Sequence, residues 1–396
     1  MLTSIYRLSQ FLSVFIFFIN KDDKLCYIQP MNRKRTLLQI PQGTESVILE
    51  EAYIHRKITG RLGELYESWG YLPAQIPVID FYDIYRPLLD EASAQKIYRL
   101  IDREGDLLML RSDITMFLAK QTGLSITEED LPVRVWYGDA ILRHQELEDI
   151  SKNEFFQTGI ELIGKRGMPG DLEVLMLLAK TLETAGLKGS FIHIGSRALF
   201  ESCFAQLSAE KKKKIGSRII NREPWIDLID KDEDSIPDAA ALLFQNLFQF
   251  IGDSSAYRDF CRENSENLPQ EAAGNMLYIK TVIKELEEFL KGDNLRIDLS
   301  EIGTQPYYTG IVFQVYMDGL DSAIASGGRY DELLGSFGFD CPSVGFSLLQ
   351  RKIEPFIGNP EELKPHKEII HIDAGSFKEA YLQAEEERRK GKIPLL

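Results

Sequence analysis

The stretch from Val133 to Gly164, VRVWYGDAILRHQELEDISKNEFFQTGIELIG, decides the fold. Its first run, Val133 to His144, and its second, Phe155 to Gly164, are rich in β-branched and aromatic residues. The segment between them, Gln145 to Glu154, is polar. Two such runs on either side of a polar loop predict a pair of neighbouring strands. Both runs also contain polar side chains, which makes them candidates for a functional site as well as for the core.

Further elements are predicted on both sides of this pair. A hairpin is expected from Tyr98 to Ile101 and Leu107 to Leu110, around a polar turn that contains Gly105. Other strands are expected at Ser190 to Ile194, Leu295 to Leu299, Tyr307 to Met317 and Ala323 to Ser326. Helices are expected at His55 to Trp69, Asp171 to Ala185 with Asp171 as N-cap, near Tyr330 to Phe337, and Val344 to Ile353. This order predicts an α+β fold, a mostly antiparallel sheet flanked by helices.

The chain divides into four parts by composition. Residues 31–195 and 293–356 carry the predicted strands and form the expected core. Residues 196–292 are helical in pattern and charge-rich, and are expected to be a helical insertion. Its lysine run, residues 211–214, is interpreted as a solvated helix face. Residues 357–396 hold one strand and one helix, too little for an independent core, so this tail is expected to lie against another part or another chain.

The N-terminal residues 1–30 are unlike the rest of the chain. Phe11 to Ile19 is almost entirely apolar, but it is far shorter than the roughly 20 residues that a membrane span needs. Met31 opens a segment that resembles an ordinary protein start. The favoured interpretation is a wrongly extended start site, with residues 1–30 disordered or absent in the cell. A secretory signal is the alternative, although no small-residue cleavage site follows cleanly.

Composition narrows the function. The 396 residues are 44% hydrophobic and 27% charged, which is typical of a globular protein without a membrane span, and the net charge is -15. An acidic chain is repelled by phosphate backbones, so nucleic acid is not the expected partner. The four cysteines form no CxxC pair and the five histidines no HxxxH spacing, so neither a metal site nor a disulfide framework is expected. Reduced thiols suit a cytoplasmic protein.

Polar side chains recur in or beside the predicted strands in three clusters. Asp113 and Thr115 lie two apart and share a face if their segment is extended. Gln157 and Glu161 share a face of their strand in the same way. The candidate site residues are Asp113, Thr115, Arg143, Gln157, Glu161, Tyr307, Tyr308 and Tyr330. Carboxylates that pair with an ammonium, and an arginine that pairs with a carboxylate, suit a zwitterionic amino acid. Taken singly, each could be an ordinary surface residue of an edge strand.

These clusters resemble the signature motifs of histidyl-tRNA synthetase and its paralogue, the regulatory subunit of ATP phosphoribosyltransferase. The resemblance runs from about Thr44 to Ile353 with the motifs in the same order. It implies a class II synthetase-like fold. It is carried by Leu110-Arg111-Ser112-Asp113-Ile114-Thr115, Leu142-Arg143-His144-Gln145, Tyr307-Tyr308-Thr309-Gly310, Gly327-Gly328-Arg329-Tyr330-Asp331 and Val344-Gly345-Phe346.

The departures from the synthetase pattern are informative. Gln145 stands where the synthetases have a glutamate that holds Mg²⁺, and an amide is a poorer ligand for that ion. Ser151 and Asn153 replace arginines that meet the triphosphate, in a loop that is here acidic. Gly303 stands in place of the catalytic arginine and cannot stabilise developing charge. The resemblance leads us to expect an anticodon-binding domain reduced to one βα unit. Amino-acid recognition is thus expected to remain while activation chemistry is lost.

The resemblance therefore implies a non-catalytic regulatory subunit that binds L-histidine, with no catalytic residue, cofactor or metal of its own. It implies a short-form catalytic ATP phosphoribosyltransferase as partner and a homodimer, through the His55 to Ile79 region, within a hetero-oligomer. The family activates that partner and confers feedback inhibition by histidine in histidine biosynthesis. The alternatives are an active histidyl-tRNA synthetase and a stand-alone histidine sensor or tRNA-binding module.

Overall fold

The computed structural model describes residues 41, 43–144, 153–229, 236–290, 294–357, 369–372 and 376–395. The expectations for residues 1–30, for Gln145 and Ser151, and for the acidic loop between them fall outside the described residues. Within the described ranges, the helices are too short or too polar to cross a membrane.

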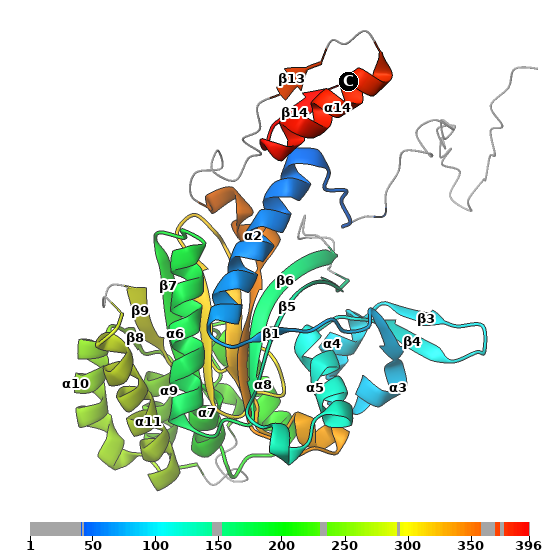
Figure 1. Ribbon diagram of the computed structural model, residues 1–396. Helices are drawn as coiled ribbons and strands as arrows, with labels where there is room; N and C mark the ends of the chain where they lie inside the picture. Colours follow the sequence, from blue (N-terminus) through cyan, green and yellow to red (C-terminus); the bar gives the residue numbers. More distant parts are fainter. Residues whose placement is uncertain are drawn as a thin grey trace, which may run out of the picture.

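A nine-stranded sheet in the order β1-β5-β6-β12-β11-β10-β7-β9-β8 forms the body of the molecule (Figure 1). Neighbouring strands are antiparallel except for β1 with β5 and β7 with β9. The predicted pair of strands is its longest hairpin, paired from Val133 with Ile163 to Leu142 with Glu154. The strands are β1 (Leu72–Pro73), β5 (Val133–Leu142), β6 (Glu154–Ile163), β7 (Ser190–Ser196), β8 (Ile251–Gly252), β9 (Leu295–Asp298), β10 (Ile311–Met317), β11 (Ala325–Arg329) and β12 (Ser343–Leu349).

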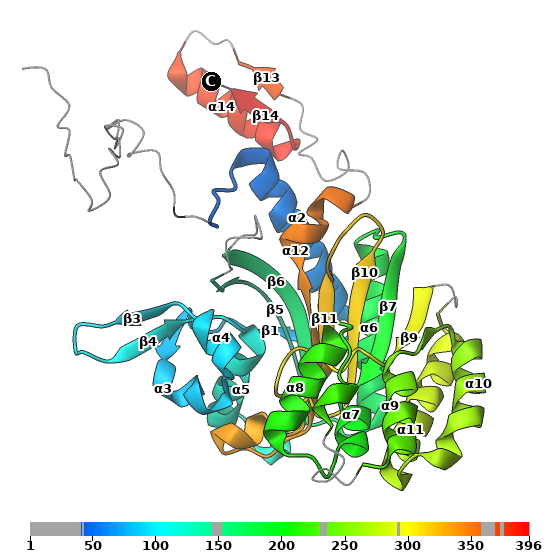
Figure 2. The ribbon, with the colours of Figure 1, turned by 180° about the vertical axis from the view of Figure 1, so that it is seen from behind.

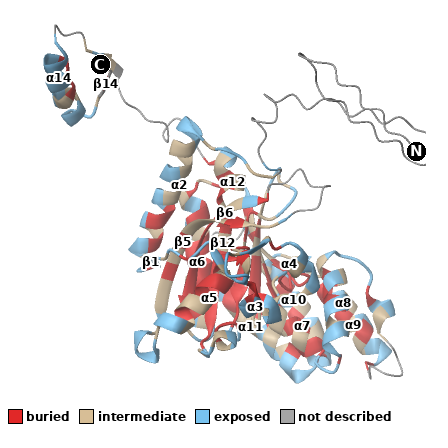
Figure 3. Ribbon diagram, turned by 90° about the vertical axis from the view of Figure 1, so that its right-hand side faces the viewer, coloured by how far each residue is buried: buried red, intermediate tan, exposed pale blue. Residues whose placement is uncertain are grey.

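Helices α2 (Leu49–Ser68) and α6 (Met168–Thr184) cover one face of this sheet (Figures 1 and 2). Alternation along the strands explains which side chains they meet. Ile160 and Leu162 of β6 join the α2 and α6 core, whereas Ile163 lies in a second core on the other face. Buried residues are accordingly concentrated in the central strands and α6 (Figure 3). Glu161 is thereby directed to the face opposite α2.

A smaller unit between β1 and β5 packs on that other face. Its three-stranded sheet, in the order β2-β4-β3, is followed by α5 (Ile114–Ser125), whose apolar side fills the second core. The predicted hairpin is confirmed, since β3 and β4 pair from Arg99 with Met109 to Ile101 with Leu107. The remaining elements of this unit are β2 (Ile79–Phe81), α3 (Tyr82–Tyr85), α4 (Glu91–Gln95), β3 (Arg99–Ile101) and β4 (Leu107–Leu110).

The segment expected as a helical insertion lies between β7 and β9. It is mainly helical, and its apolar side chains join the same continuous core as α2 and α6. It consists of α7 (Arg197–Cys203), α8 (Ala209–Ile220), α9 (Asp238–Phe248), α10 (Ser254–Asn264) and α11 (Gln270–Glu287), with the two-residue strand β8. The lysines of α8 make ion pairs with Glu201, Asp90 and Glu210, as suits a solvated helix face.

The C-terminal segment forms a small βαβ unit, so the expectation of one strand and one helix was wrong by the second strand, β14. β13 (Ile369–His371) and β14 (Ile393–Leu395) are parallel, and α14 (Phe377–Arg389) connects them. This unit lies at the same end of the molecule as the start of α2 (Figure 1). Ala380 and Ala384 are its buried helix residues, while Phe377 is 75% exposed.

Three expectations for helices were wrong. The segment Val344 to Ile353 is mostly strand, since β12 runs from Ser343 to Leu349 and only one turn of helix, α12 (Gln350–Ile353), follows it. Val344, Phe346 and Leu348 face the main core and Gly345 and Ser347 the other side, an alternation of period two that is typical of a strand. The segment near Tyr330 to Phe337 contains only a short 3₁₀ helix, η6 (Leu334–Phe337). Asp171 is not an N-cap: α6 begins three residues earlier, and the buried Asp171 carboxylate pairs with Arg329.

Candidate functional site

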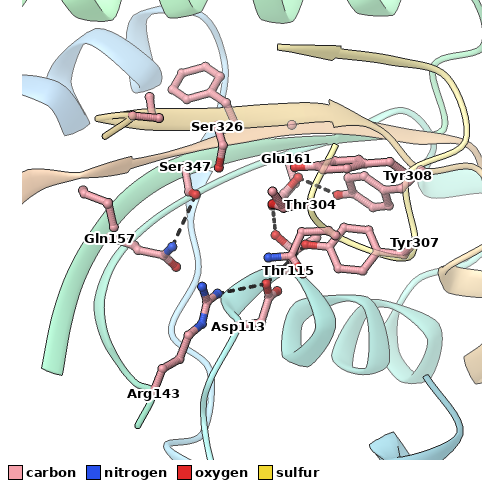
Figure 4. Close-up of a pocket in the computed structure, with 17 residues that line it drawn as sticks. Asp113, Thr115, Arg143, Gln157, Glu161, Thr304, Tyr307, Tyr308, Ser326 and Ser347 are labelled. Atoms are coloured by element: carbon pink, nitrogen blue, oxygen red, sulfur yellow. Dashed lines mark hydrogen bonds and ion pairs between the residues drawn. The ribbon is translucent and has the colours of Figure 1, made fainter. Parts of the chain in front are cut away.

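All eight side chains singled out from the sequence line one cavity of about 120 Å³ on the sheet face opposite α2 (Figure 4). They come from the N-terminus of α5, the residue after β5, strand β6, the loop before β10, and the residue after β11. Pockets for drug-sized ligands are typically about 300–1,000 Å³. This cavity therefore suits a smaller polar molecule.

Glu161 forms the base of the cavity and is 2% exposed. Its Oε1 accepts a hydrogen bond from Thr115 Oγ1 at 2.6 Å, and its Oε2 accepts one from the Tyr330 hydroxyl at 2.5 Å. Tyr137 donates to Oε1 at 3.3 Å. Burial raises the pKa of Glu161 to about 7, although these hydrogen bonds oppose the shift. A carboxyl group poised near neutrality thus lies beneath any bound ligand.

Glycine makes room for this carboxylate. Gly345 of β12 lies directly opposite Glu161 in the strand pairing. A Cβ at residue 345 would collide with the Glu161 carboxylate, so only glycine leaves the side chain in its observed position. Gly328 of β11, paired with Gly345, likewise leaves space for the Tyr308 ring.

Asp113 is placed by a helix start rather than by a strand. The spacing of Asp113 and Thr115 had suggested an extended segment, but a helix begins at Ile114. Asp113 is the N-cap of α5, and its Oδ1 accepts the Met116 backbone N–H at 2.9 Å. Its second oxygen accepts a hydrogen bond from the Tyr307 hydroxyl at 3.2 Å. Thr115 follows in the first helical turn and reaches Glu161 from there.

Arg143 and Gln157 line another side of the cavity (Figure 4). Arg143 follows the last residue of β5, and its Nε donates to the Ser112 carbonyl at 2.6 Å. Its Nη2 lies 3.4 Å from Asp113 Oδ2. Gln157 donates to Ser347 of β12 at 3.4 Å. The cavity therefore presents one fixed cation between polar groups.

Tyrosines form the remaining wall. The rings of Tyr307 and Tyr308 are 5.2 Å apart between centroids, and those of Tyr307 and Tyr330 are 5.7 Å apart. Tyr330 is 3% exposed, and burial raises the pKa of its hydroxyl, which stays a hydrogen-bond donor to Glu161. The wall is aromatic with hydroxyl groups directed at both carboxylates.

Sequence reasoning missed several lining residues, mostly small ones on β11 and β12. Once both strands are known, the alternation along each one places Ser326, Gly345 and Ser347 on the face of the sheet that carries Glu161. The error in assigning β12 as a helix concealed this signal. The missed residues are Thr304, Gln305, Ala323, Ala325, Ser326, Gly345, Phe346, Ser347 and Leu349.

Gly303 is not among the lining residues. Its φ is +80°, and a Cβ there would come within 2.5 Å of the Tyr308 ring. A larger residue at this position is therefore opposed both by backbone strain and by the tyrosine beside it.

Among the described residues, one group could in principle hold a metal ion: His193, Asp298 and Glu301. Its carboxylates already have partners. Arg222 Nη2 lies 2.6 Å from Asp298 Oδ2, and the Tyr316 hydroxyl donates to Glu301 at 2.6 Å. This group is best explained as a satisfied hydrogen-bond network.

A family model for histidyl-tRNA synthetase matches residues 43–353, a range that includes every residue of the cavity. The chain belongs to the histidyl-tRNA synthetase family. Similar curated proteins are named ATP phosphoribosyltransferase regulatory subunit. The one from Bacillus pumilus is 31% identical over 85% of each chain. The one from Clostridium kluyveri is 28% identical over 89% of this chain and 91% of the other. The resemblance inferred from the motifs is confirmed.

Solved structures share the fold. A Bacillus halodurans structure described as an ATP phosphoribosyltransferase regulatory subunit/histidyl-tRNA synthetase has a TM-score of 0.79 at 22% identity, covering 91% of this chain and 92% of the other. A histidyl-tRNA synthetase from a Nostoc species has a TM-score of 0.73 at 20% identity, covering 90% and 85%. The expected class II synthetase-like α+β architecture is confirmed.

Proposed function

We propose that this chain is a regulatory subunit of ATP phosphoribosyltransferase that binds L-histidine in the cavity above Glu161. The observation that carries the proposal is the joining of two carboxylates, one arginine and three tyrosines in one small cavity. The names of the relatives support the regulatory role. The chain itself activates a short-form catalytic subunit, and histidine binding to the chain confers feedback inhibition.

The ligand groups match the cavity by charge. The histidine ammonium is proposed to lie among Asp113, Thr115, Gln157 and Glu161. Arg143, held by the Ser112 carbonyl, meets the carboxylate. Tyr307, Tyr308 and Tyr330 enclose the imidazole end.

We propose further that the chain does not activate histidine for transfer to tRNA. Formation of an adenylate needs positive charge at the reacting carboxylate. Gly303, at the position where the synthetases carry their catalytic arginine, supplies none, and its φ of +80° and the adjoining Tyr308 disfavour a larger side chain. Arg143 is the cation that lines the cavity, and Asp113 lies beside it.

The proposed homodimer is supported by an exposed apolar surface. In the β2-β4-β3 sheet, the side chains directed away from the second core include Ile79, Phe81 and Leu100. They are 44%, 48% and 36% exposed. A three-stranded sheet with an uncovered apolar face is a natural surface for a second copy. We name this surface, defined by these three residues, the hairpin face.

The test is phosphoribosyltransferase activity of the short catalytic subunit from the same organism, with and without this chain, across a histidine titration. We expect the chain to raise the activity and histidine then to suppress it. Glu161→Ala should weaken that suppression about tenfold or more, whereas Lys214→Ala, on an exposed face of α8, should not. Activity that is indifferent to the chain would contradict the proposal.

An active synthetase is the second candidate, because the family model is that of histidyl-tRNA synthetase. It predicts histidine-dependent exchange between ATP and pyrophosphate, which we expect to be absent. A stand-alone histidine sensor would bind histidine but leave the phosphoribosyltransferase unaffected. Calorimetry on the isolated chain measures whether it binds histidine at all. It thus distinguishes a synthetase or a sensor from a chain that binds no histidine.

A further inference from the structure

Tyr307 and Tyr308 each line two cavities. On one side lies the candidate histidine site, and on the other a larger open hollow of about 630 Å³. Both tyrosines are only partly buried, and Pro306 before them is exposed. The two rings therefore form a thin wall between the interior site and the protein surface.

The hollow is assembled from segments that are distant in the sequence. Pro87 of the small unit, Glu201 of α7, Glu271 of α11 and Glu332 after β11 surround the tyrosine wall. The small unit with α5 and the helices α7 and α8 lie on the same side of the main sheet (Figure 2). A partner in this hollow would thus contact both helical regions and the loop that carries the tyrosines.

The charges of the hollow select the kind of partner. Arg197 and Glu201 both line the hollow and pair with each other, and Glu201 also pairs with Lys212. Glu271 and Glu332 are exposed, and among the described residues no ion pair involves either of them. Two carboxylates at the rim and two tyrosine rings at the floor match a lysine or arginine side chain, which gains from carboxylate pairing and from the ring faces.

We propose that this hollow is the docking site for a basic segment of the catalytic subunit, an inference that rests on the proposed function. The overall charge of -15 favours the approach of a basic partner to the chain in general. The hollow provides the specific binding site for the basic segment of that partner. A strand or loop presenting one or two basic side chains fits an open hollow of this size.

The shared wall also provides the physical link between the two events. Histidine contacts Tyr307 and Tyr308 from the inside, and the basic segment contacts them from the outside. A ring position that suits one occupant alters the affinity for the other, and this coupling is reciprocal by thermodynamic necessity. The effect of histidine on the catalytic subunit is thus transmitted through the side chains of Tyr307 and Tyr308.

The test compares the doubly charge-reversed variant Glu271→Lys/Glu332→Lys with a matched control, Glu64→Lys/Glu67→Lys, on the exposed side of α2. Both pairs change the net charge equally, and α2 covers the opposite face of the sheet. The dissociation constant for the catalytic subunit is measured by sedimentation velocity, at low and high salt. Histidine binding to each isolated variant is measured by calorimetry.

We expect the hollow variant to bind the catalytic subunit at least about tenfold more weakly, with a smaller salt dependence, and to bind histidine as the wild type does. The control should bind both normally. Normal assembly by the hollow variant, while the wild type also assembles, overturns the inference and leaves the proposed function intact. Loss of assembly by the control variant alone would move the docking surface to α2. A wild type that does not bind the catalytic subunit contradicts the proposed function itself.

Discussion

Glu161 is one buried residue that both lines the proposed histidine site and changes its protonation state near neutral pH. It has an ordinary carboxyl group on a strand, yet burial raises its pKa from 4.5 to about 7. The ligand-free protein must therefore either protonate Glu161 or bear an unpaired buried charge. The motif match identifies the residue, but its raised pKa follows from burial in the folded protein, which the hydrogen bonds from Thr115, Tyr330 and Tyr137 oppose.

The sign of the stability effect follows from that shift. Between the unfolded value of 4.5 and the folded value of about 7, the folded state binds more protons, so the free energy of unfolding falls as pH rises through this window. The full effect is about 3 kcal/mol. We predict that Glu161→Gln flattens the decline between pH 5 and pH 8 in urea unfolding. An equally steep decline in the variant would contradict the assigned pKa.

Gly345 sets the position of the same carboxylate. We predict that Gly345→Ala displaces the Glu161 side chain and weakens histidine binding about tenfold or more, at a stability cost of about 1–3 kcal/mol. Gly274→Ala is the matched control, because a Cβ there meets nothing within 4 Å. The control should leave histidine binding unchanged and raise stability by about 0.5–1 kcal/mol, as expected for a helix interior. Calorimetry and urea unfolding measure both effects.

At the scale of elements, the contacts of the last residue of β11 determine where one wall of the cavity lies. Arg329, its last residue, pairs with Asp171 of α6 at 2.6 Å, and both side chains are almost fully buried. Arg329 also donates to the carbonyls of Lys165 and Gly167. Tyr330 follows immediately, so this ion pair holds the strand end that positions one wall of the cavity.

We predict that Arg329→Met destabilises the fold by about 3–5 kcal/mol, because Asp171 is left as an unpaired buried charge. Lys214→Met removes the exposed pair with Glu210 and should change stability by no more than about 0.5 kcal/mol. Denaturant unfolding of both variants provides the comparison. Equal effects would mean that the buried pair contributes no more than a surface one.

At the scale of the whole molecule, the exposed hairpin face and the open hollow indicate where other protein chains bind. The hairpin face belongs to the small unit that projects from the main sheet (Figure 1). The hollow behind the tyrosine wall faces another direction of approach, formed by α7, α11 and the loop before β10. A homodimer and a catalytic partner can therefore use different surfaces of one chain.

We predict that Phe81→Glu/Leu100→Glu converts the dimer to a monomer, since each change places a charge in the apolar hairpin face. The matched control is Leu242→Glu/Leu277→Glu, on exposed positions of α9 and α11 that are 55% and 60% exposed. Sedimentation equilibrium reports the mass, and histidine calorimetry reports whether the monomer stays folded. A wild-type chain that is already monomeric would remove the basis of this prediction.

The sequence by itself determined the family, the central pair of strands and eight of the residues that line the cavity, because the motifs and their spacing can be read along the chain. Only the tertiary structure decided what those residues meet. Asp113 caps a helix, and Ser343–Leu349 is the strand β12, because it pairs with β6 on one side and with β11 on the other. The space left by Gly345 and the second hollow behind the tyrosines depend on strands and helices that are distant in the chain, and no local pattern encodes such contacts.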